Sequence, residues 1–429
     1  MHNKNKIFIF LILLSVSTFM AQSQSFNSPY STFGLGDLTF KGFGRNMAMG
    51  GISLGVRNSQ SIDFANPASY TIRDSLSLVF DIGLVGNVSR ISSEEGENTP
   101  FDVNFSHLAF SFPISKKFTF GAGLVPYSLS NYNFIYSVDE NDDTYNPEVG
   151  RLDYLFKGEG GLSQLFFGMG FEITKNLSLG VNVNYIFGNL QKVQTVTLLE
   201  SPNAHHPKVD IQQIVNGFNF NTGLQYTAHL KEDLDLVIGG TYGLSSNINE
   251  KTEFLASNIL FSPSGGQSID TLSSYTTGKE KKQFPSSYGV GFTINKANKI
   301  IIGADYKRTN WANSNILGLD SLENSQSFLI GGEYTPNPRE LKAYFPRIHF
   351  RAGAYYTNSF LKVNNYRIND FGITFGVGFP IGFSRSSFNL AFDYGKRGTK
   401  NDNLILENHG SIVFSLTLYD FWFMKRKFD

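Results

Sequence analysis

The sequence predicts an all-β fold, a transmembrane antiparallel β-barrel of about 14 strands. Three observations predict it. Stretches that alternate between apolar and small or polar residues recur along the whole chain, short and long connections alternate between them, and aromatic residues are abundant, with 41 Phe and 20 Tyr in 429 residues. Alternation places one set of side chains on each face of a strand. One apolar face and one small or polar face are typical of a barrel wall in a membrane.

The alternating stretches have the length and spacing of membrane strands. Each is close to the roughly 9 to 11 residues that a tilted strand needs to cross the hydrocarbon. Short turns join successive pairs, whereas the longest polar segments, 128–164, 189–216 and 244–285, lie between pairs. Short turns belong on the periplasmic side, so we expect both termini there. A secreted β-sandwich or propeller is the alternative, but a propeller needs a sequence repeat that this chain lacks.

The first residues, 1–23, are expected to be a cleaved signal peptide. Two lysines precede an apolar run over residues 7–20, and Ala21 and Ser23 place small residues at the positions that a signal peptidase reads. The run is shorter than the roughly 20 residues of a spanning helix, which makes an N-terminal anchor the weaker alternative. Export without a helical anchor leads us to expect the bacterial cell outer membrane.

Composition and motifs give no sign of an enzyme, a metal site or a cofactor. The chain has no cysteine, which removes disulfides, thiol nucleophiles and thiolate ligands, and its net charge of +0 gives no footprint for nucleic acid. No Ser/His/acid constellation can be read from the histidine spacing. The run Asp139–Asp143 resembles the start of a calcium loop, but Thr144 replaces the turn glycine and Gly150 replaces the bidentate glutamate, so a solvated acidic loop is predicted.

A barrel of this size encloses more space than its own side chains fill. We expect residues 24–75 to form an N-terminal plug, or hatch, residues 76–419 to form the barrel with long extracellular loops, and residues 420–429 to form a short periplasmic tail. Buried charges are costly unless they are paired, so Arg45 or Arg57 of the plug is predicted to dock against lumenal carboxylates. Solvated charges without fixed partners are the alternative. The side chains predicted to face the lumen are Asp81, Glu172, Asp305, Glu333, Arg351 and Asp393.

The predicted plug carries a family resemblance. Gly44-Arg45, the run from Ala48 to Gly51, and Asn66-Pro67-Ala68 resemble the hatch of the FadL/TodX family, and the run from Ser28 to Asp37 is similar to a branch found in Bacteroidota. The resemblance implies a fourteen-stranded outer-membrane barrel with an N-terminal plug, and many members pass long-chain fatty acids or aromatic hydrocarbons. The plug residues singled out in this way are Arg45, Gly50, Gly51, Arg57, Asn66, Pro67 and Ala68.

The resemblance also implies a lateral opening at the third strand. That strand contains Gly121, Gly123 and Pro126; proline lacks the N–H that a ladder needs, and glycine permits a bulge. The alternative is that the glycines fit a crowded wall and Pro126 follows the last paired residue. The last strand is expected to stop early, because its aromatic end at Tyr419 is followed by further residues.

Two functional classes remain open at the level of sequence. The first is a passive channel for hydrophobic small molecules such as fatty acids, which the retained hatch motif favours. The second is a non-transporting accessory barrel subunit of a larger outer-membrane complex, of the barrel-assembly or type IX-like secretion kind. The expected partners are outer-membrane lipid, a hydrophobic ligand or detergent in the lumen, and other outer-membrane or periplasmic proteins.

Overall fold

The computed structural model describes nine stretches of the chain: 28–39, 42–92, 97–201, 204–261, 267–316, 322–363, 365–382, 384–401 and 404–422. The predicted signal peptide lies outside these residues, as do residues 40 and 41 of the predicted plug and most of the predicted tail. The last strand continues to Phe421, past the predicted end of the barrel at residue 419.

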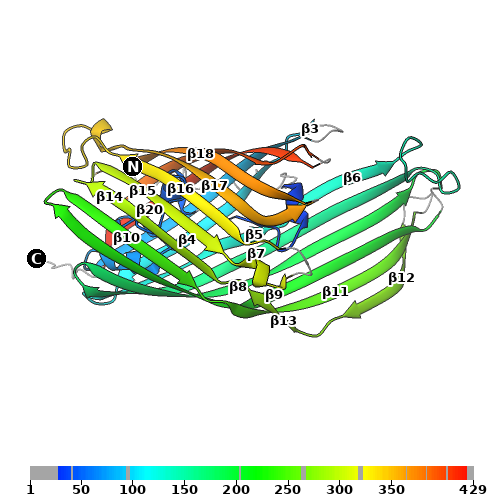
Figure 1. The fold of residues 1–429 in the computed structure, drawn as a ribbon, viewed down its shortest axis with the longest axis horizontal. Coiled ribbons are helices and arrows are strands. Elements are labelled where there is room, and N and C mark those ends of the chain that lie inside the picture. The colour runs from blue at the N-terminus through cyan, green and yellow to red at the C-terminus, as the bar shows by residue number, and fades with distance from the viewer. Residues whose placement is uncertain are drawn as a thin grey trace, which may run out of the picture.

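The fold is a closed antiparallel β-barrel, as the sequence predicts (Figure 1). It closes because the first and last wall strands pair without interruption from Ser77↔Phe421 to Ser92↔Leu406. The 14 wall strands are β2 (Ser77–Ser92), β4 (Phe101–Pro113), β5 (Phe118–Leu129), β7 (Leu152–Thr174), β8 (Leu177–Leu198), β9 (His206–Lys231), β10 (Leu234–Gly243), β14 (Ser287–Lys296), β15 (Ile300–Thr309), β16 (Ser325–Tyr334), β17 (His349–Val363), β18 (Tyr366–Pro380), β19 (Ser387–Gly398) and β20 (Leu406–Phe421).

The two faces of the wall differ as the alternation requires. On β8, Leu179 and Val181 are exposed on the outer face, whereas Asn182 and Asn184 are buried on the inner face. Amide side chains can be buried inside because they find hydrogen-bond partners there, and Asn182 donates to the carbonyl oxygen of Phe64 at 3.0 Å. The outer face is therefore apolar and the lumen is polar.

The segments predicted as long loops are largely strands. β7, β8 and β9 have 23, 22 and 26 residues and extend beyond the rest of the barrel, together with β6 (Tyr132–Val138), β11 (Ser246–Phe261) and β12 (Gln267–Thr276), toward the right of Figure 1. The loop prediction was wrong because alternation marks a strand only where its two faces meet different surroundings. Backbone pairing continues in these extensions although much of their side-chain surface is exposed, so the pattern fades while the strand persists.

Residues 28–39 and 42–75, together called the N-terminal segment below, lie inside the barrel. Its elements are short: η1 (Pro29–Thr32), β1 (Asp37–Leu38), α2 (Gly44–Met47) and η2 (Pro67–Ile72). η2 contacts β5, β7, β8 and β9, while α2 contacts β18, β19 and β20, so the segment touches opposite arcs of the wall. Within the described residues, no helix is long and apolar enough to cross a membrane. The other short elements are β3 (Glu97–Asn98), β13 (Glu280–Phe284), η3 (Trp311–Asn313) and η5 (Phe345–Arg347).

Candidate functional site

A buried ion cluster ties the N-terminal segment to the wall. Arg45 donates from Nε to Oε2 of Glu333 at 3.0 Å and from Nη2 to Oε1 at 3.1 Å. Arg351 lies opposite Glu333 in the β16–β17 ladder and donates from Nε to the same Oε2 at 2.7 Å. All three residues are 6% exposed. One carboxylate thus accepts from two guanidinium groups in a site with little water, where unpaired charge is expensive.

The other cations of the segment use neutral partners. Arg57 donates from Nη1 to Ser178 Oγ at 3.2 Å and to Gln225 Oε1 at 3.1 Å, rather than to a carboxylate. Arg73 donates from Nη1 to the carbonyl oxygen of Asn58 at 3.2 Å. Of the two arginines for which docking was predicted, Arg45 is hydrogen-bonded to a lumenal carboxylate, whereas the hydrogen bonds of Arg57 go to neutral groups.

A second wall carboxylate binds the backbone of the N-terminal segment. Oδ2 of Asp305 accepts from the backbone N–H groups of Ser53 at 2.7 Å and Leu54 at 2.9 Å. Lys307, two positions along the same strand, donates to Ser53 Oγ at 2.8 Å. Charge-assisted bonds of this kind are stronger than those between neutral groups, so this contact fixes the middle of the segment.

Two of the remaining predicted lumenal charges, Asp81 and Asp393, have partners within the wall. Asp81 bonds Nε2 of His107 at 2.8 Å and accepts from Thr417 at 2.9 Å, and Asp393 accepts from the Tyr355 hydroxyl at 3.0 Å. Glu172 is half-buried. The lumenal role of His107 was not predicted from the sequence. The signal for it was that His107 stands two residues before Ala109 and therefore points to the same, inward face of β4.

The two glycines of the hatch-like motif, Gly50 and Gly51, adopt a left-handed backbone conformation, and Gly50 packs closely against the wall. Gly50 has φ +68°, its N–H donates to Thr374 Oγ1 at 2.7 Å, and a Cβ there would lie 2.6 Å from the carbonyl oxygen of Ile330. Gly51 follows with φ +83°. Only glycine combines this conformation with such contact at low cost.

The Asn66-Pro67-Ala68 motif starts η2 and docks it against the wall. Oδ1 of Asn66 accepts from the Ala68 N–H at 3.1 Å, and Nδ2 donates to the carbonyl oxygens of Leu54 at 2.8 Å and Leu224 at 3.2 Å. Pro67 occupies the first turn, where its missing N–H costs nothing. One asparagine therefore caps a turn, joins two parts of the N-terminal segment and contacts β9.

Asp63 makes the packing of the N-terminal segment sensitive to pH. Burial raises the pKa of this carboxyl to about 7, although Lys307 and the hydrogen bonds from Asn46 and Ala65 oppose the shift. The folded chain therefore holds a proton that the unfolded chain releases at an ordinary pKa of about 4. Stability from this group is complete below about pH 4 and is lost as the pH rises through about 7.

We expect Asp63→Asn to flatten the pH dependence of stability between about pH 4 and pH 7, because it removes the titrating group. Melting temperature of the purified protein in detergent, measured across this range, checks the expectation. Asp143→Asn, at an exposed turn position, is the control and should leave the slope unchanged. An Asp63→Asn slope equal to that of the wild type would contradict it.

The wall is interrupted between β4 and β5. These strands pair only from Leu108↔Leu124 to Pro113↔Thr119. Just beyond this ladder, β4 shifts its register against β2 at Ser106, and β5 shifts its register against β7 at Tyr127. Among the described residues, no strand pairs with β4 on this side over residues 101–107. We call this interruption the wall gap.

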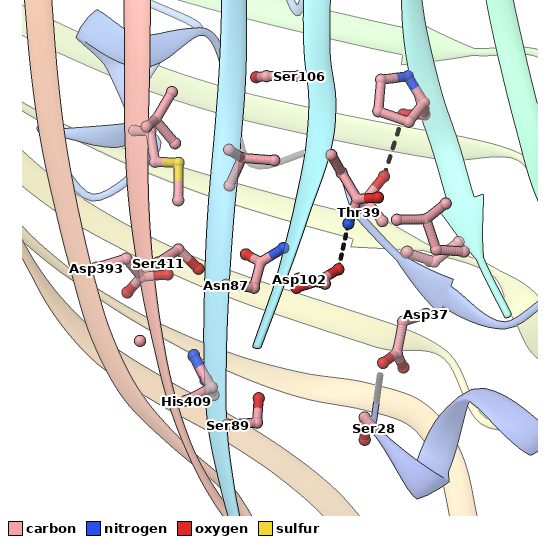
Figure 2. A pocket seen from close by; sticks show the side chains of 18 of the residues that line it. Ser28, Asp37, Thr39, Asn87, Ser89, Asp102, Ser106, Asp393, His409 and Ser411 are labelled. Atoms are coloured by element: carbon pink, nitrogen blue, oxygen red, sulfur yellow. Dashed lines mark hydrogen bonds between the residues drawn. The ribbon is translucent and has the colours of Figure 1, made fainter. Parts of the chain in front are cut away.

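The N-terminal segment borders the wall gap. β1 pairs with the end of β5 through Asp37↔Leu129 and Leu38↔Ser128, and Thr39 donates from Oγ1 to the Pro126 carbonyl oxygen at 3.2 Å. Figure 2 shows Thr39 between the two separated strands, with Asp37 nearby and Asp102 opposite. Pro126 thus lies past the last β4–β5 pair.

The two glycines predicted for a lateral opening lie in the paired part of the third strand. Gly121 is paired with Ser111 and Gly123 with Ala109. Added Cβ atoms would meet the Tyr70 ring and the Leu108 carbonyl oxygen, respectively. These glycines therefore provide space for close packing, and the interruption begins after them.

A cavity of about 180 Å³ lies behind the wall gap, and acidic side chains dominate it. Arg397 is paired with Asp37 at 2.8 Å, and Nε2 of His409 lies 2.9 Å from Asp370. No other basic side chain lines the cavity within the described residues. The carboxylates in its lining are Asp37, Asp102, Asp370, Asp393 and Glu407.

The cavities deeper in the lumen are small. One of about 280 Å³ lies beside Lys307. Another, of about 240 Å³, is lined both by apolar residues such as Phe64 and Trp311 and by polar residues such as Asn219 and Asn221. Buried Ile186 and Phe284 line the smaller cavity and belong to a larger apolar cluster. Both volumes are below the roughly 300–1,000 Å³ of typical small-molecule sites. In the part of the chain that the structure describes, no group of three or more His, Asp or Glu residues is arranged to hold a metal ion.

Comparisons with known proteins connect this architecture to two groups. A family model described as BamG matches residues 3–429. The solved structure of the toluene transporter TodX from Pseudomonas putida matches with a TM-score of 0.59 and 16% identity over 89% of this chain and 99% of its own.

Two further structures show the same fold. The Ralstonia pickettii toluene transporter TbuX matches with a TM-score of 0.58 and 18% identity, over 88% of this chain and 98% of its own. A Pseudomonas aeruginosa FadL homologue matches with a TM-score of 0.57 and 12% identity, over 90% of this chain and 99% of its own. No curated protein matches the sequence significantly. At these identities the structural similarity concerns the fold alone.

Proposed function

The chain belongs to the BamG family, and from this premise we propose that it is a non-transporting accessory subunit of an outer-membrane protein complex. The complex would be one that inserts or secretes proteins. The barrel would lie in the outer membrane with both termini in the periplasm, and the N-terminal segment would act as its plug.

The observation that carries the proposal is the fixed, charged filling of the lumen. The N-terminal segment is held by the Arg45–Glu333–Arg351 cluster and by Asp305, and it contacts opposite arcs of the wall. A hydrophobic cargo that entered through the wall gap would meet a cavity rich in carboxylates. Transfer of an apolar molecule into such surroundings gains little free energy. This arrangement favours a scaffold over a conduit.

Co-purification tests the proposal. The tagged chain, solubilised from its native membrane in mild detergent, is expected to bring down other membrane proteins at a constant molar ratio. A gene deletion should impair the abundance or surface display of membrane proteins and leave uptake of hydrophobic compounds unchanged. The proposal would be overturned if the tagged chain were isolated without other proteins and if deletion of its gene abolished the uptake of hydrophobic compounds.

A passive channel for hydrophobic small molecules is the second candidate. The overall fold of the toluene transporters TbuX and TodX and the interrupted wall favour it. The cavity beside Phe64 and Trp311 offers such a ligand an aromatic wall, next to amide side chains. Mass spectrometry of the purified protein discriminates the candidates, because a channel should retain a lipid or hydrocarbon that Trp311→Glu displaces.

A further inference from the structure

The edge of β4 at the wall gap is open for backbone pairing. β4 pairs with β2 from Val79↔Ser111 to Val88↔Phe101, but with β5 only from Leu108 onward. Across Phe101–Ser106, one edge of the strand therefore has no ladder partner among the described residues. Unpaired N–H and C=O groups on a strand edge are a template for another strand, and in a membrane they are costly to leave unsatisfied.

The opposite border of the wall gap is also a strand edge. β1 pairs with β5 on one side, through Asp37 and Leu38, and has no other ladder partner in the described ranges. The cavity behind the wall gap is lined both by β1 and by the open edge of β4. An extended segment that entered here would have an edge on each side. Of the two edges, that of β4 is the longer and offers the main pairing surface.

The side chains at the wall gap define what such a segment would carry. Phe101 and Phe105 are exposed on the outer face, while Asp102 is buried on the inner face. Glu407 is 4% exposed, and its Oε2 has no hydrogen-bond partner. Among the described residues, the cavity lining therefore holds five carboxylates, one guanidinium and one imidazole. Side chains of an incoming strand would alternate between an apolar exterior and this acidic interior.

We propose that the wall gap binds an extended polypeptide segment of a partner protein, which adds as a strand to Phe101–Ser106 and directs a lysine or arginine into the acidic cavity. The inference rests on the proposed accessory function and names the kind of contact that this subunit makes. Backbone pairing supplies affinity in this mode of recognition, and the alternating side chains supply specificity. A basic side chain would neutralise part of the negative charge and give Oε2 of Glu407 a hydrogen-bond partner.

A labelled peptide tests this inference on the purified full-length protein in detergent. The probe is a capped peptide of alternating valine and lysine, as long as the Phe101–Ser106 edge, and its binding is followed by fluorescence anisotropy. Glu407→Gln is expected to weaken binding about tenfold, the range for loss of a charge-assisted hydrogen bond. Glu250→Gln is the matched control: Glu250 is 6% exposed, also has an unpartnered Oε2, and lies in β11 away from the wall gap.

Two further peptides separate strand addition from simple charge attraction. A version with N-methyl groups on alternate backbone nitrogens keeps the lysines but cannot extend a ladder, and a version with glutamate for lysine keeps the ladder but reverses the charge. Both are expected to bind at least about tenfold more weakly. Equal binding of either, or equal effects of Glu407→Gln and Glu250→Gln, would overturn the inference. If the valine–lysine peptide does not bind but other membrane proteins still co-purify with the chain, the inference about the wall gap is wrong and the proposed accessory function remains.

Discussion

Replacement of Arg45 by glutamate is expected to release the N-terminal segment from the wall. The new carboxylate would lie against Glu333 in a site where both residues are 6% exposed. Arg351 would then be the one guanidinium left, among the described residues, to neutralise two carboxylates. Breaking a buried ion pair by removing one partner typically costs about 3–5 kcal/mol, because it leaves an uncompensated charge. We expect a loss of this size in the free energy that holds the segment in the lumen.

Two measurements check the Arg45→Glu prediction. Limited proteolysis of the purified protein should cut the variant within residues 42–75 while the wild type resists, and cells with the variant should admit large antibiotics or detergent. Arg90→Glu is the control, because Arg90 is an exposed residue whose partner, Glu97, is also exposed. Unchanged proteolysis and permeability in Arg45→Glu would show that the cluster does not hold the segment.

Replacement of Gly239 by leucine is expected to have the second large effect. A Cβ at this position would lie 1.8 Å from the carbonyl oxygen of Leu54, which belongs to the backbone of the N-terminal segment. Backbone cannot move aside as a flexible side chain can, so either the segment or β10 must shift. Overpacking of this kind costs about 1–3 kcal/mol or more.

The chain offers a matched control at the next residue. A Cβ at Gly240 would meet only the Gly289 carbonyl oxygen, at 3.9 Å, so Gly240→Leu adds the same side chain to the same strand with room for it. We expect Gly239→Leu to lower the melting temperature and expose the N-terminal segment to protease, and Gly240→Leu to do neither. Equal behaviour of the two variants would refute the close docking of Leu54 against β10.

The barrel was predictable because its signal repeats. Membrane strands must present apolar groups to hydrocarbon at every second residue, and pairs such as Leu179 and Val181 on β8 show this period in the sequence. The strand extensions were not predicted because side chains on both of their faces are wholly or partly exposed. Ile269 and Leu272, two exposed apolar residues of the short strand β12, are examples. Without a difference between faces, periodicity carries no information.

The charged contacts were only partly predictable. The inward phase of Glu333 and Arg351 and the presence of Arg45 in the segment could be read from the sequence, because phase and composition are local properties. The sequence did not show that Arg45 would pair with Glu333 rather than with Asp305 or Asp393. That choice depends on how the segment crosses the lumen, and therefore on contacts between residues 288 positions apart.

The sequence alone therefore determined a barrel wall, its lipid-facing and lumenal faces, and a polar N-terminal segment whose arginines need partners when they are buried. Only the tertiary structure decided which carboxylate binds Arg45, where the ladder between β4 and β5 ends, and that the resulting cavity is acidic. The physical reason is that a strand pattern records the surroundings of each residue along its own strand. Docking, ladder ends and cavity charge arise between strands, from distances that a single stretch of chain does not encode.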